Sequence, residues 1–385
     1  MTDHTVPPRG SAPGISPPHV IHVVISLAHG GLERLVVDWT NARNRRHPGS
    51  TSICCLDQLG ELATEVEGDA LCSLAAQRSR FPYDRDAVAA LCSLANTRGA
   101  QTVLHSHNLA AQQYAALVSK AHGFRHVCTQ HGANVHNHSL LNRIRSRLLT
   151  RYTDVMVAVA ESTAGAMQKN FGIPARSIHV IPNGIDADAV SEPFTASELR
   201  FRLGLGANSI VLGSVGRLDR VKGYDRLIEV MPDLCTDLNV VLLLVGEGPC
   251  REELERLAQD LGVVNQVVFA GFRSDAQRYL GVFDLFVLPS RNEGLSIALL
   301  EAMASGVPVL VTDVGENRRV IDEGRAGRIL PAEAREWASC IRSLVGSADE
   351  LKEVASRAKL RVREMYSLRS VMRSYEELYR HTEAR

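Results

Sequence analysis

The sequence predicts an α/β protein with two doubly wound units in tandem, each a parallel sheet covered by helices. Short apolar runs alternate with longer helical stretches, which is typical of βαβ units. The pattern restarts after a polar stretch near residues 185–197, and 385 residues are enough for two hydrophobic cores. Because aromatic residues make up 5% of the chain while Ala, Val and Leu are abundant, the composition favours buried parallel strands over a β-sandwich.

The apolar runs place the expected strands and helices. In the first unit, strands are expected at 19–27, 51–56, 101–104, 125–129, 154–159 and 178–181. In the second unit, they are expected at 209–215, 240–245, 267–270, 285–288 and 307–311. Helices are expected from residues 32 and 223 onward, and over 195–203, 251–261 and 296–304. The charged stretch 351–385 predicts an amphipathic helix with a solvated face.

These elements divide the chain into four parts. Residues 1–18 are rich in proline and predict a flexible tail, which we set apart from the fold. Residues 19–190 form the first Rossmann-like unit, 191–365 the second, and 366–385 a C-terminal helix. Two such units facing each other leave a cleft at the carboxyl ends of their strands, where open α/β sheets bind ligands.

Composition and charge exclude several classes of protein. Lys+Arg and Asp+Glu both total 43, so the chain lacks the basic excess of a nucleic-acid-binding protein. Hydrophobic residues make up 45%, which is too many for a disordered chain. We find no signal peptide in the first 18 residues and no uncharged apolar run long enough to span a membrane. The eight cysteines form no C-x-x-C pair, so we interpret them as reduced thiols of a cytoplasmic protein.

Two cations follow the first strand of the second unit. Arg217 and Lys222 lie in the loop between that strand and the helix that begins near Gly223. Fixed cations at a strand end, beside a helix N-terminus, are suited to bind a diphosphate. We therefore select Arg217 and Lys222 as candidate phosphate-binding residues and interpret Arg220 as a surface charge.

Two pairs of glycines also follow predicted strands. Gly30 and Gly31 precede a helix, where they allow close backbone approach to a ligand and where the helix N-terminus favours an anion. Gly246 and Gly248 follow the strand at 240–245. Because Arg251 stands where a dinucleotide fingerprint has its third glycine, we reject NAD binding and expect a close backbone approach to a nucleotide.

The most specific pattern joins two glutamates. Glu293 lies at a loop tip, and Glu301 lies eight residues on, about two helical turns, so we expect both to face the same side. The backbone N–H groups of Gly294, Leu295 and Ser296 would open the helix toward an anion. Glu301 is surrounded by apolar residues, and a carboxylate there needs a partner. Two hydroxyl groups of a ligand would serve.

Histidines are concentrated in the first unit, where thirteen of the fourteen lie before residue 180. His105 and His107 follow one predicted strand, and His131 follows another. Histidine is a common metal ligand, but no Asp or Glu lies near these residues in the sequence, so we expect no metal. We interpret His131, beside a glycine, as functional. Capping or satisfied core positions are the alternative for His105 and His107.

Taken together, these residues resemble the retaining GT-B glycosyltransferases of family 4. The similarity extends over essentially the whole chain from about residue 19 onward. It rests on Gly30-Gly31-Leu32-Glu33, Thr129-Gln130-His131-Gly132, Ile181-Pro182-Asn183-Gly184-Ile185-Asp186, Gly216-Arg217-Leu218 with Lys222-Gly223, Gly246-Glu247-Gly248-Pro249, and the Glu293/Glu301 pair. The glutamate pair with Arg-x4-Lys upstream is the specific part of this resemblance.

The resemblance implies a GT-B fold and the transfer of a sugar from a nucleotide-diphosphate donor, such as a UDP- or GDP-sugar. Configuration would be retained, and no metal or other cofactor would be required. Arg217 and Lys222 would hold the diphosphate, Glu301 the ribose hydroxyls and Glu293 the donor sugar. His131 would lie near the reaction centre.

The resemblance also assigns supporting positions. Gly294, Leu295 and Ser296 would make backbone contacts with the donor, and Phe272 would fall at the base pocket. The glycine pair at 30 and 31 would lie beside the phosphates and the acceptor. The C-terminal helix would cross back onto the first unit. The expected pathway is synthesis of exopolysaccharide, capsule or lipopolysaccharide, with a glycan or lipid-linked acceptor.

A basic stripe bears on the acceptor. Arg143, Arg147 and Arg151 recur every four residues beside Ile144 and Leu148. A basic amphipathic helix can lie on an anionic membrane, which would give peripheral contact with the cytoplasmic membrane. The alternative is an ordinary helix whose apolar stripe packs on the sheet.

Two other functions fit the same architecture. A nucleotide-sugar epimerase would turn over its donor without an acceptor. A nucleotide-binding module without catalysis would neither turn over a donor nor bind an acceptor. The sequence argues against this alternative, because it contains together Arg217, Lys222, Glu293 and His131.

Overall fold

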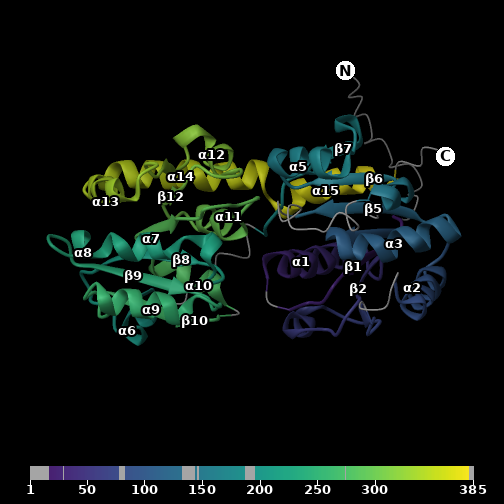
Figure 1. Ribbon diagram of the computed structural model, residues 1–385, viewed down its shortest axis with the longest axis horizontal. Helices are drawn as coiled ribbons and strands as arrows, with labels where there is room; N and C mark the ends of the chain where they lie inside the picture. The colour runs from purple at the N-terminus through teal and green to yellow at the C-terminus, as the bar shows by residue number, and fades with distance from the viewer. Residues whose placement is uncertain are drawn as a thin grey trace, which may run out of the picture.

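The protein has two α/β units, each built on a parallel sheet (Figure 1). The structure, a computed structural model, describes residues 17–28, 30–77, 83–131, 144, 147–186, 196–273 and 275–380. We call the part around the first sheet the N-terminal unit and the part around the second sheet the C-terminal unit. The predicted fold class, two doubly wound parallel-sheet units, is confirmed.

The N-terminal unit contains a seven-stranded sheet in the order β3-β2-β1-β4-β5-β6-β7. Its strands are β1 (Val20–Val24), β2 (Thr51–Cys55), β3 (Leu71–Ser73), β4 (Val103–His107), β5 (Arg125–Gln130), β6 (Val155–Ala158) and β7 (Ile178–Val180). The order reverses between β1 and β4, which is the switch point where doubly wound sheets open a crevice.

Helices cover both faces of this first sheet. They are α1 (Gly31–Arg46), α2 (Arg85–Thr97), α3 (Asn108–His122) and α5 (Glu161–Phe171). One face packs on α2 and α3 through residues such as Leu91 and Tyr114. The opposite face packs on α1, through Leu35 and Trp39, and on a helix from the chain's C-terminal end.

The C-terminal unit repeats the arrangement with six strands in the order β10-β9-β8-β11-β12-β13. Its strands are β8 (Ile210–Val215), β9 (Val240–Val245), β10 (Val267–Gly271), β11 (Leu285–Leu288), β12 (Val309–Val311) and β13 (Arg328–Ile329). Its helices are α6 (Ala196–Arg202), α7 (Tyr224–Glu229), α8 (Met231–Leu234), α9 (Arg251–Asp260), α10 (Ala276–Tyr279), α11 (Ile297–Ala304), α12 (Asn317–Val320), α13 (Trp337–Val345) and α14 (Ala348–Met365). Strands β9 and β11 are apolar along their length, as expected for strands buried on both faces of a parallel sheet.

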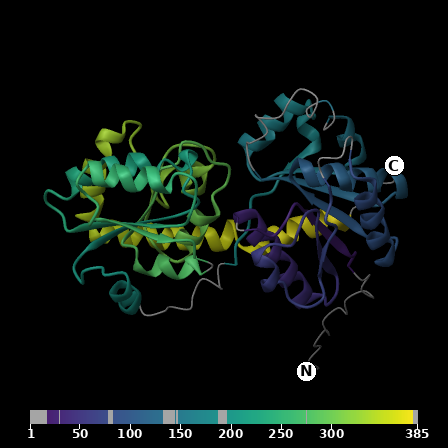
Figure 2. The ribbon, with the colours of Figure 1, turned by 60° about the horizontal axis from the view of Figure 1, so that its bottom comes forward.

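The last helix, α15 (Leu368–Arg380), belongs to the N-terminal unit in space. Figure 2 shows α14 and α15 running from one unit into the other. The Arg43 Nε lies 2.7 Å from Glu376 Oε1, and the Arg125 Nε donates to the Leu378 carbonyl at 2.9 Å. Helix α15 is amphipathic with a solvated face, as the sequence predicts, and its apolar face packs back on the N-terminal unit, as the resemblance implies. Its buried residues are Leu368, Val371, Met372, Tyr375 and Tyr379.

Two short edge strands, β3 and β13, are missing from the sequence prediction. They have three and two residues, too few to show the periodicity of a strand. The strands that the sequence does predict are all confirmed, with ends that differ from the prediction by a few residues. The domain boundary near residue 190 and most of the predicted tail lie outside the described residues, so these stay predictions.

Candidate functional site

The two strongest candidates of the C-terminal unit meet directly. Lys222 ends a short 3-10 turn after β8, and its Nζ lies 2.6 Å from Glu293 Oε1 in the loop after β11. Gly223 follows with a φ of 69°, and a Cβ placed on it would collide with the Pro289 carbonyl, so no side chain fits there. Ser290 donates its hydroxyl to the same Glu293 oxygen at 2.7 Å. Glu293 is thus held, 9% exposed, between two donors.

Arg217 lies in the same loop but is not held in this way. Its side chain is 72% exposed, and its Nε is 4.0 Å from Asp219 Oδ2. The guanidinium group of Arg217 can therefore turn toward a ligand without first breaking a contact with a buried partner. Arg220, interpreted as a surface charge, is 81% exposed and pairs with Glu253.

The glycines after β8 and β9 pack two loops on each other. The Leu218 N–H donates to the Glu247 carbonyl at 2.9 Å, and the Cys250 N–H donates to the Leu218 carbonyl at 2.9 Å. A Cβ at Gly246 would collide with the Gly216 carbonyl, and one at Gly248 would collide with the Leu218 carbonyl. Loop packing therefore explains why these positions are glycine, and their predicted contact with a nucleotide stays a prediction.

The segment from Glu293 to Glu301 is helical only in its second half. Helix α11 begins at Ile297, with Ser296 as its N-cap, and Glu293 and Gly294 lie in the preceding loop. The expectation that two helical turns align both glutamates is therefore wrong. Leu295 and Ser296 are buried, and the Gly294 carbonyl accepts from the Glu316 N–H at 3.2 Å, so the loop is held from both sides.

Glu301 lies within α11 and lines a cavity of about 270 Å³ between the units. Gln277 donates its side-chain amide to Glu301 Oε1 at 2.7 Å. Burial raises the pKa of Glu301 to about 7, with the Gln277 hydrogen bond opposing the rise. From α1, the side chains of Arg34 and Asp38 line the same cavity. Burial also raises the pKa of Asp38 to about 6.

The glycine pair after β1 lies at the boundary of the two units. Gly31 is the first residue of α1, and a Cβ placed on it would lie 3.4 Å from Ile297 Cγ1, at the start of α11. Two helix N-termini thus converge on one place, with Gly30 as the exposed N-cap of α1. Phe272 follows β10 and is 42% exposed.

His131 lies directly after β5 in the N-terminal unit. Its Nε2 is 2.9 Å from His107 Nδ1, and its Nδ1 is 3.1 Å from Asn183 Oδ1. Burial lowers its pKa to about 4, with the Asn183 hydrogen bond opposing the fall. Both ring nitrogens are engaged within the protein, so the imidazole is neutral and fixed rather than a free base.

Within the described residues, His22, His105 and His107 could offer three metal ligands, with candidate atoms all within 4.8 Å of one another. The two ring nitrogens of His105 already contact Tyr379 and Thr129, at 2.7 and 2.8 Å. Those of His107 contact His22 and His131. The cluster is therefore satisfied by hydrogen bonds, as the core interpretation of His105 and His107 expects.

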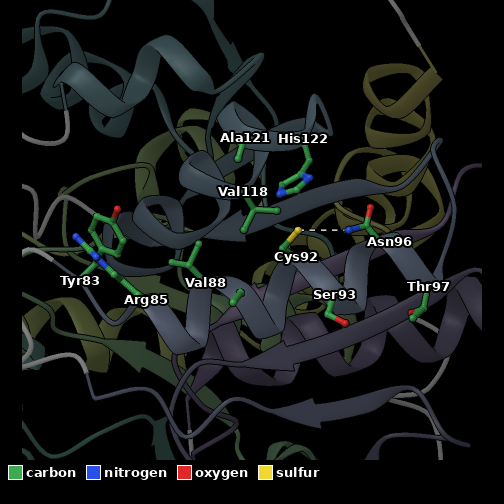
Figure 3. A pocket seen from close by; sticks show the side chains of 11 residues that line it. Tyr83, Arg85, Val88, Cys92, Ser93, Asn96, Thr97, Val118, Ala121 and His122 are labelled. Atoms are coloured by element: carbon green, nitrogen blue, oxygen red, sulfur yellow. Dashed lines mark hydrogen bonds between the residues drawn. The ribbon is translucent and has the colours of Figure 1, made fainter.

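A larger hollow, of about 700 Å³, lies away from these residues, between α2 and α3 (Figure 3). Val88, Cys92 and Val118 form its apolar part, and Arg85 and His122 contribute polar groups. It shares no residue with the predicted site. The larger hollow and the predicted site are therefore two separate places on the protein.

The sequence prediction missed three polar side chains that hold the candidate residues. Gln277 contacts Glu301, Ser290 contacts Glu293 and Asn183 contacts His131. Asn183 lies within the motif at 181–186, although no role was given to it, and Ser290 lies three residues before Glu293, so both had a signal in the sequence. Gln277 comes from α10, 24 residues before Glu301, and carries no such signal.

Comparison with known proteins places the chain in a family. Residues 29–189 match the family described as Glycosyltransferase Family 4, and residues 196–361 match Glycosyl transferases group 1. The chain belongs to the family 4, group 1 glycosyltransferases. The two matches fall on the N-terminal and the C-terminal unit of the GT-B fold.

Individual glycosyltransferases are similar over parts of the chain. A GDP-mannose-dependent alpha-(1-6)-phosphatidylinositol monomannoside mannosyltransferase of Mycobacterium tuberculosis is 33% identical over 215 residues, covering 51% of this chain and 55% of that protein. Lipopolysaccharide core biosynthesis mannosyltransferase LpsB of Rhizobium meliloti is 31% identical over 196 residues, covering 49% and 54%. The chain thus matches about half the length of these relatives.

A solved structure shares the fold over nearly the whole chain. Anabaena Alr3699/HepE in complex with UDP-glucose superposes with a TM-score of 0.80 and 21% identity, covering 94% of this chain and 99% of that one. The GT-B glycosyltransferase fold is therefore the architecture that positions the residues described above.

Proposed function

We propose that the protein transfers a sugar from a nucleotide-diphosphate-sugar to an acceptor hydroxyl, with retention of configuration and without a metal. The observation that carries this proposal is the Lys222–Glu293 pair, held at 2.6 Å where the loops after β8 and β11 meet. Exposed Arg217 lies on the same loop as Lys222, so two cations are available to one diphosphate. The family membership supports the same reaction.

The chemistry requires stabilisation of the charge that develops on the leaving diphosphate. Lys222, the exposed Arg217 and the N-terminus of α11 supply it, and a single preorganised donor contributes about 2.7–4 kcal/mol. Binding of the diphosphate by Lys222 releases Glu293 from its ion pair, which leaves that carboxylate free for the hydroxyls of the donor sugar. A phosphate oxygen of the donor then takes the proton of the attacking hydroxyl, so no protein base is needed.

Of the remaining predicted residues, some contact the nucleoside part of the donor and one lies on the side of the sugar and the acceptor. Glu301 accepts from the ribose hydroxyls, in exchange for its present bond from Gln277. Phe272, on the surface after β10, contacts the base. His131 contributes to the sugar and acceptor side as a fixed neutral group, because both of its nitrogens are engaged.

A panel of UDP- and GDP-sugars, scored for release of nucleotide with and without candidate acceptors, tests the proposal. Transfer that requires both a donor and an acceptor, with the product in the donor's anomeric configuration and with activity retained in a chelator, supports it. Turnover of the donor without any acceptor would indicate an epimerase. Failure of every donor to bind or react would overturn the transferase proposal.

We further propose a lipid-linked acceptor and peripheral contact with an anionic membrane. The mannosyltransferase of M. tuberculosis acts, by its name, on a phosphatidylinositol monomannoside. On the N-terminal unit, Ile144 and Leu148 are 52% and 51% exposed, one helical turn apart, beside the exposed Arg147 and Arg151. The rest of the predicted basic stripe, with Arg143, lies outside the described residues. In the described residues, no helix is long and apolar enough to cross a membrane.

Co-sedimentation with vesicles tests this contact. The wild-type protein should pellet with phosphatidylglycerol vesicles at low salt and much less with phosphatidylcholine vesicles. Ile144→Ser with Leu148→Ser should lower the bound fraction severalfold, whereas Val264→Ser, equally exposed on the C-terminal unit, should leave it unchanged. Equal binding by all variants would exclude this surface.

A further inference from the structure

A chain of buried hydrogen bonds leads from His131 into the N-terminal sheet. His131 Nε2 is 2.9 Å from His107 Nδ1, and His107 Nε2 is 3.0 Å from His22 Nδ1. At the other end, His131 Nδ1 is 3.1 Å from Asn183 Oδ1. The four side chains come from β1, β4, the end of β5 and the loop after β7, so the chain connects segments that are far apart in the sequence.

The chain fixes which nitrogen of each ring carries the proton. An amide oxygen only accepts, so His131 Nδ1 donates to Asn183 Oδ1. A neutral imidazole then has its second nitrogen as an acceptor, so His107 Nδ1 donates to His131 Nε2 and His22 Nδ1 donates to His107 Nε2. Burial keeps the rings neutral, since it lowers the pKa of His22 to about 3 and that of His107 well below its usual range.

The backbone of His131 is held by the residue next to His107. The His131 N–H donates to Asn108 Oδ1 at 3.1 Å. Asn108 has a φ of 63°, a left-handed conformation that costs energy in residues with a Cβ and that asparagine tolerates better than most. Backbone strain of this kind is concentrated at functional sites. Ring and backbone of His131 are thus held by two consecutive residues at the end of β4.

We propose that His107 and Asn108 are positioning residues for the transfer reaction, which hold His131 in one tautomer and one place at the end of β5. The inference rests on the proposed role of His131 beside the donor sugar. Neither residue touches the substrate in this account. They act through His131, whose ring and main chain cannot shift while both bonds are made.

His105 provides a matched control for His107. It lies two residues earlier in the same strand, is equally buried, and also has both ring nitrogens bonded. Its partners, however, are Tyr379 and Thr129 rather than His131. A general loss of stability should therefore affect His105→Leu and His107→Leu alike, whereas a loss of positioning should affect only the second.

The experiment compares kcat and KM of the variants with a donor and acceptor found for the wild type. His107→Leu should lower kcat about tenfold to a hundredfold with little change in donor KM, because small misplacements at a reaction centre have effects of this size. His107→Asn, whose side-chain N–H can replace the His107 Nδ1–H that donates to His131, should recover part of the lost kcat. His105→Leu should retain kcat per folded molecule. In a cycle with His131→Ala, the effect of His107→Leu should largely disappear.

Asn108→Gly covers the case in which His107→Leu does not fold. Glycine adopts a φ of 63° without strain, which offsets part of the lost side-chain hydrogen bond, so the variant should fold. The variant still removes the acceptor for the His131 N–H, so kcat should fall about tenfold. In ¹⁵N-histidine spectra, His131 should show a protonated Nδ1 in the wild type and lose this single tautomer in His107→Leu.

The two possible failures are distinguishable. Full activity of His131→Ala would remove the proposed role of His131 itself. Loss of activity in His131→Ala, combined with wild-type kcat in both His107→Leu and Asn108→Gly, would overturn only the positioning inference.

Discussion

The two units of this protein have the same strand order around their switch points but use different chemistry at their strand ends. In the C-terminal unit, charged side chains stand on glycine-rich loops, with Lys222 against Glu293 at 2.6 Å. In the N-terminal unit, neutral histidines are linked within the sheet, and His131 is their outermost member. The same architecture thus places charged side chains at the strand ends of one unit and hydrogen-bonded neutral histidines at those of the other. Function lies in the side chains placed on the fold rather than in the fold.

The difference also affects how each site is built. The C-terminal site comes from loops that pack backbone to backbone, as the loops at 216–218 and 246–248 do. The N-terminal site depends on side chains and on α15, whose Tyr379 contacts His105. Mutations at the strand ends of the C-terminal unit should therefore change ligand binding directly. Mutations in the N-terminal unit should instead act by shifting the side chains that hold His131.

The largest expected effect is on the charged side of the cleft. Lys222→Ala should lower kcat by about a hundredfold or more, because the diphosphate loses a preorganised cation. Steady-state assays of nucleotide release measure this. Arg220→Ala removes an exposed cation from the same loop and should leave kcat unchanged. Equal activity of both variants would contradict the assignment of Lys222.

Glu301 should give the next largest effect, together with a dependence on pH. Burial raises the pKa of Glu301 to about 7, so the carboxylate that we propose accepts from ribose forms only as the pH rises through 7. Nucleotide affinity of the wild type should therefore increase between pH 6 and pH 8. Glu301→Gln should bind about tenfold more weakly at pH 8 and differ less at pH 6. Calorimetric titrations at the two pH values would show this.

The same shift determines the sign of the stability effect. The folded protein favours the protonated carboxyl, so ionisation of Glu301 opposes folding. The stability that the folded protein gains from the protonated carboxyl is fully present below about pH 4.5 and is lost as the pH rises through about 7. Glu301→Gln should therefore gain thermal stability relative to the wild type at pH 8. A difference in Tm that does not change with pH would argue against the buried carboxyl.

The docking of α15 on the N-terminal unit can be broken at one glycine. A Cβ at Gly184 would lie 2.8 Å from Val371 Cγ2, so Gly184→Ala should destabilise the protein by about 1–3 kcal/mol. Denaturant unfolding measures this loss. Gly165→Ala in α5 meets no atom within 4 Å and should be neutral or slightly stabilising. Similar changes in both variants would remove the packing explanation.

The smallest expected effect concerns the second donor to Glu293. Ser290→Ala removes a 2.7 Å hydrogen bond, and kcat should fall about threefold to tenfold. Ser305→Ala removes a hydroxyl that bonds to the Glu301 carbonyl at the far end of α11, so it serves as the control. If Ser290→Ala were as severe as Lys222→Ala, Ser290 rather than the ion pair would be the main support of Glu293.

The predictability of the two sites differs for a physical reason. Arg217, Lys222 and Glu293 lie in short loops and Glu301 in the helix that follows directly, so their spacing in the sequence already indicates their chemistry. The hydrogen bonds of His22, His107 and His131 join residues 85 and 24 positions apart, and only the register of the sheet brings them together. The error at Glu293 arose because a helical period was extended beyond the N-cap at Ser296.

The central claim is that the C-terminal unit binds a diphosphate at Lys222, and calorimetry with nucleotides tests it most directly. The wild type should bind UDP or GDP at least about tenfold more tightly than the corresponding monophosphate. In Lys222→Ala that preference should fall close to one while the protein remains folded. An equal preference in both proteins, or no binding of either nucleotide, would contradict the claim.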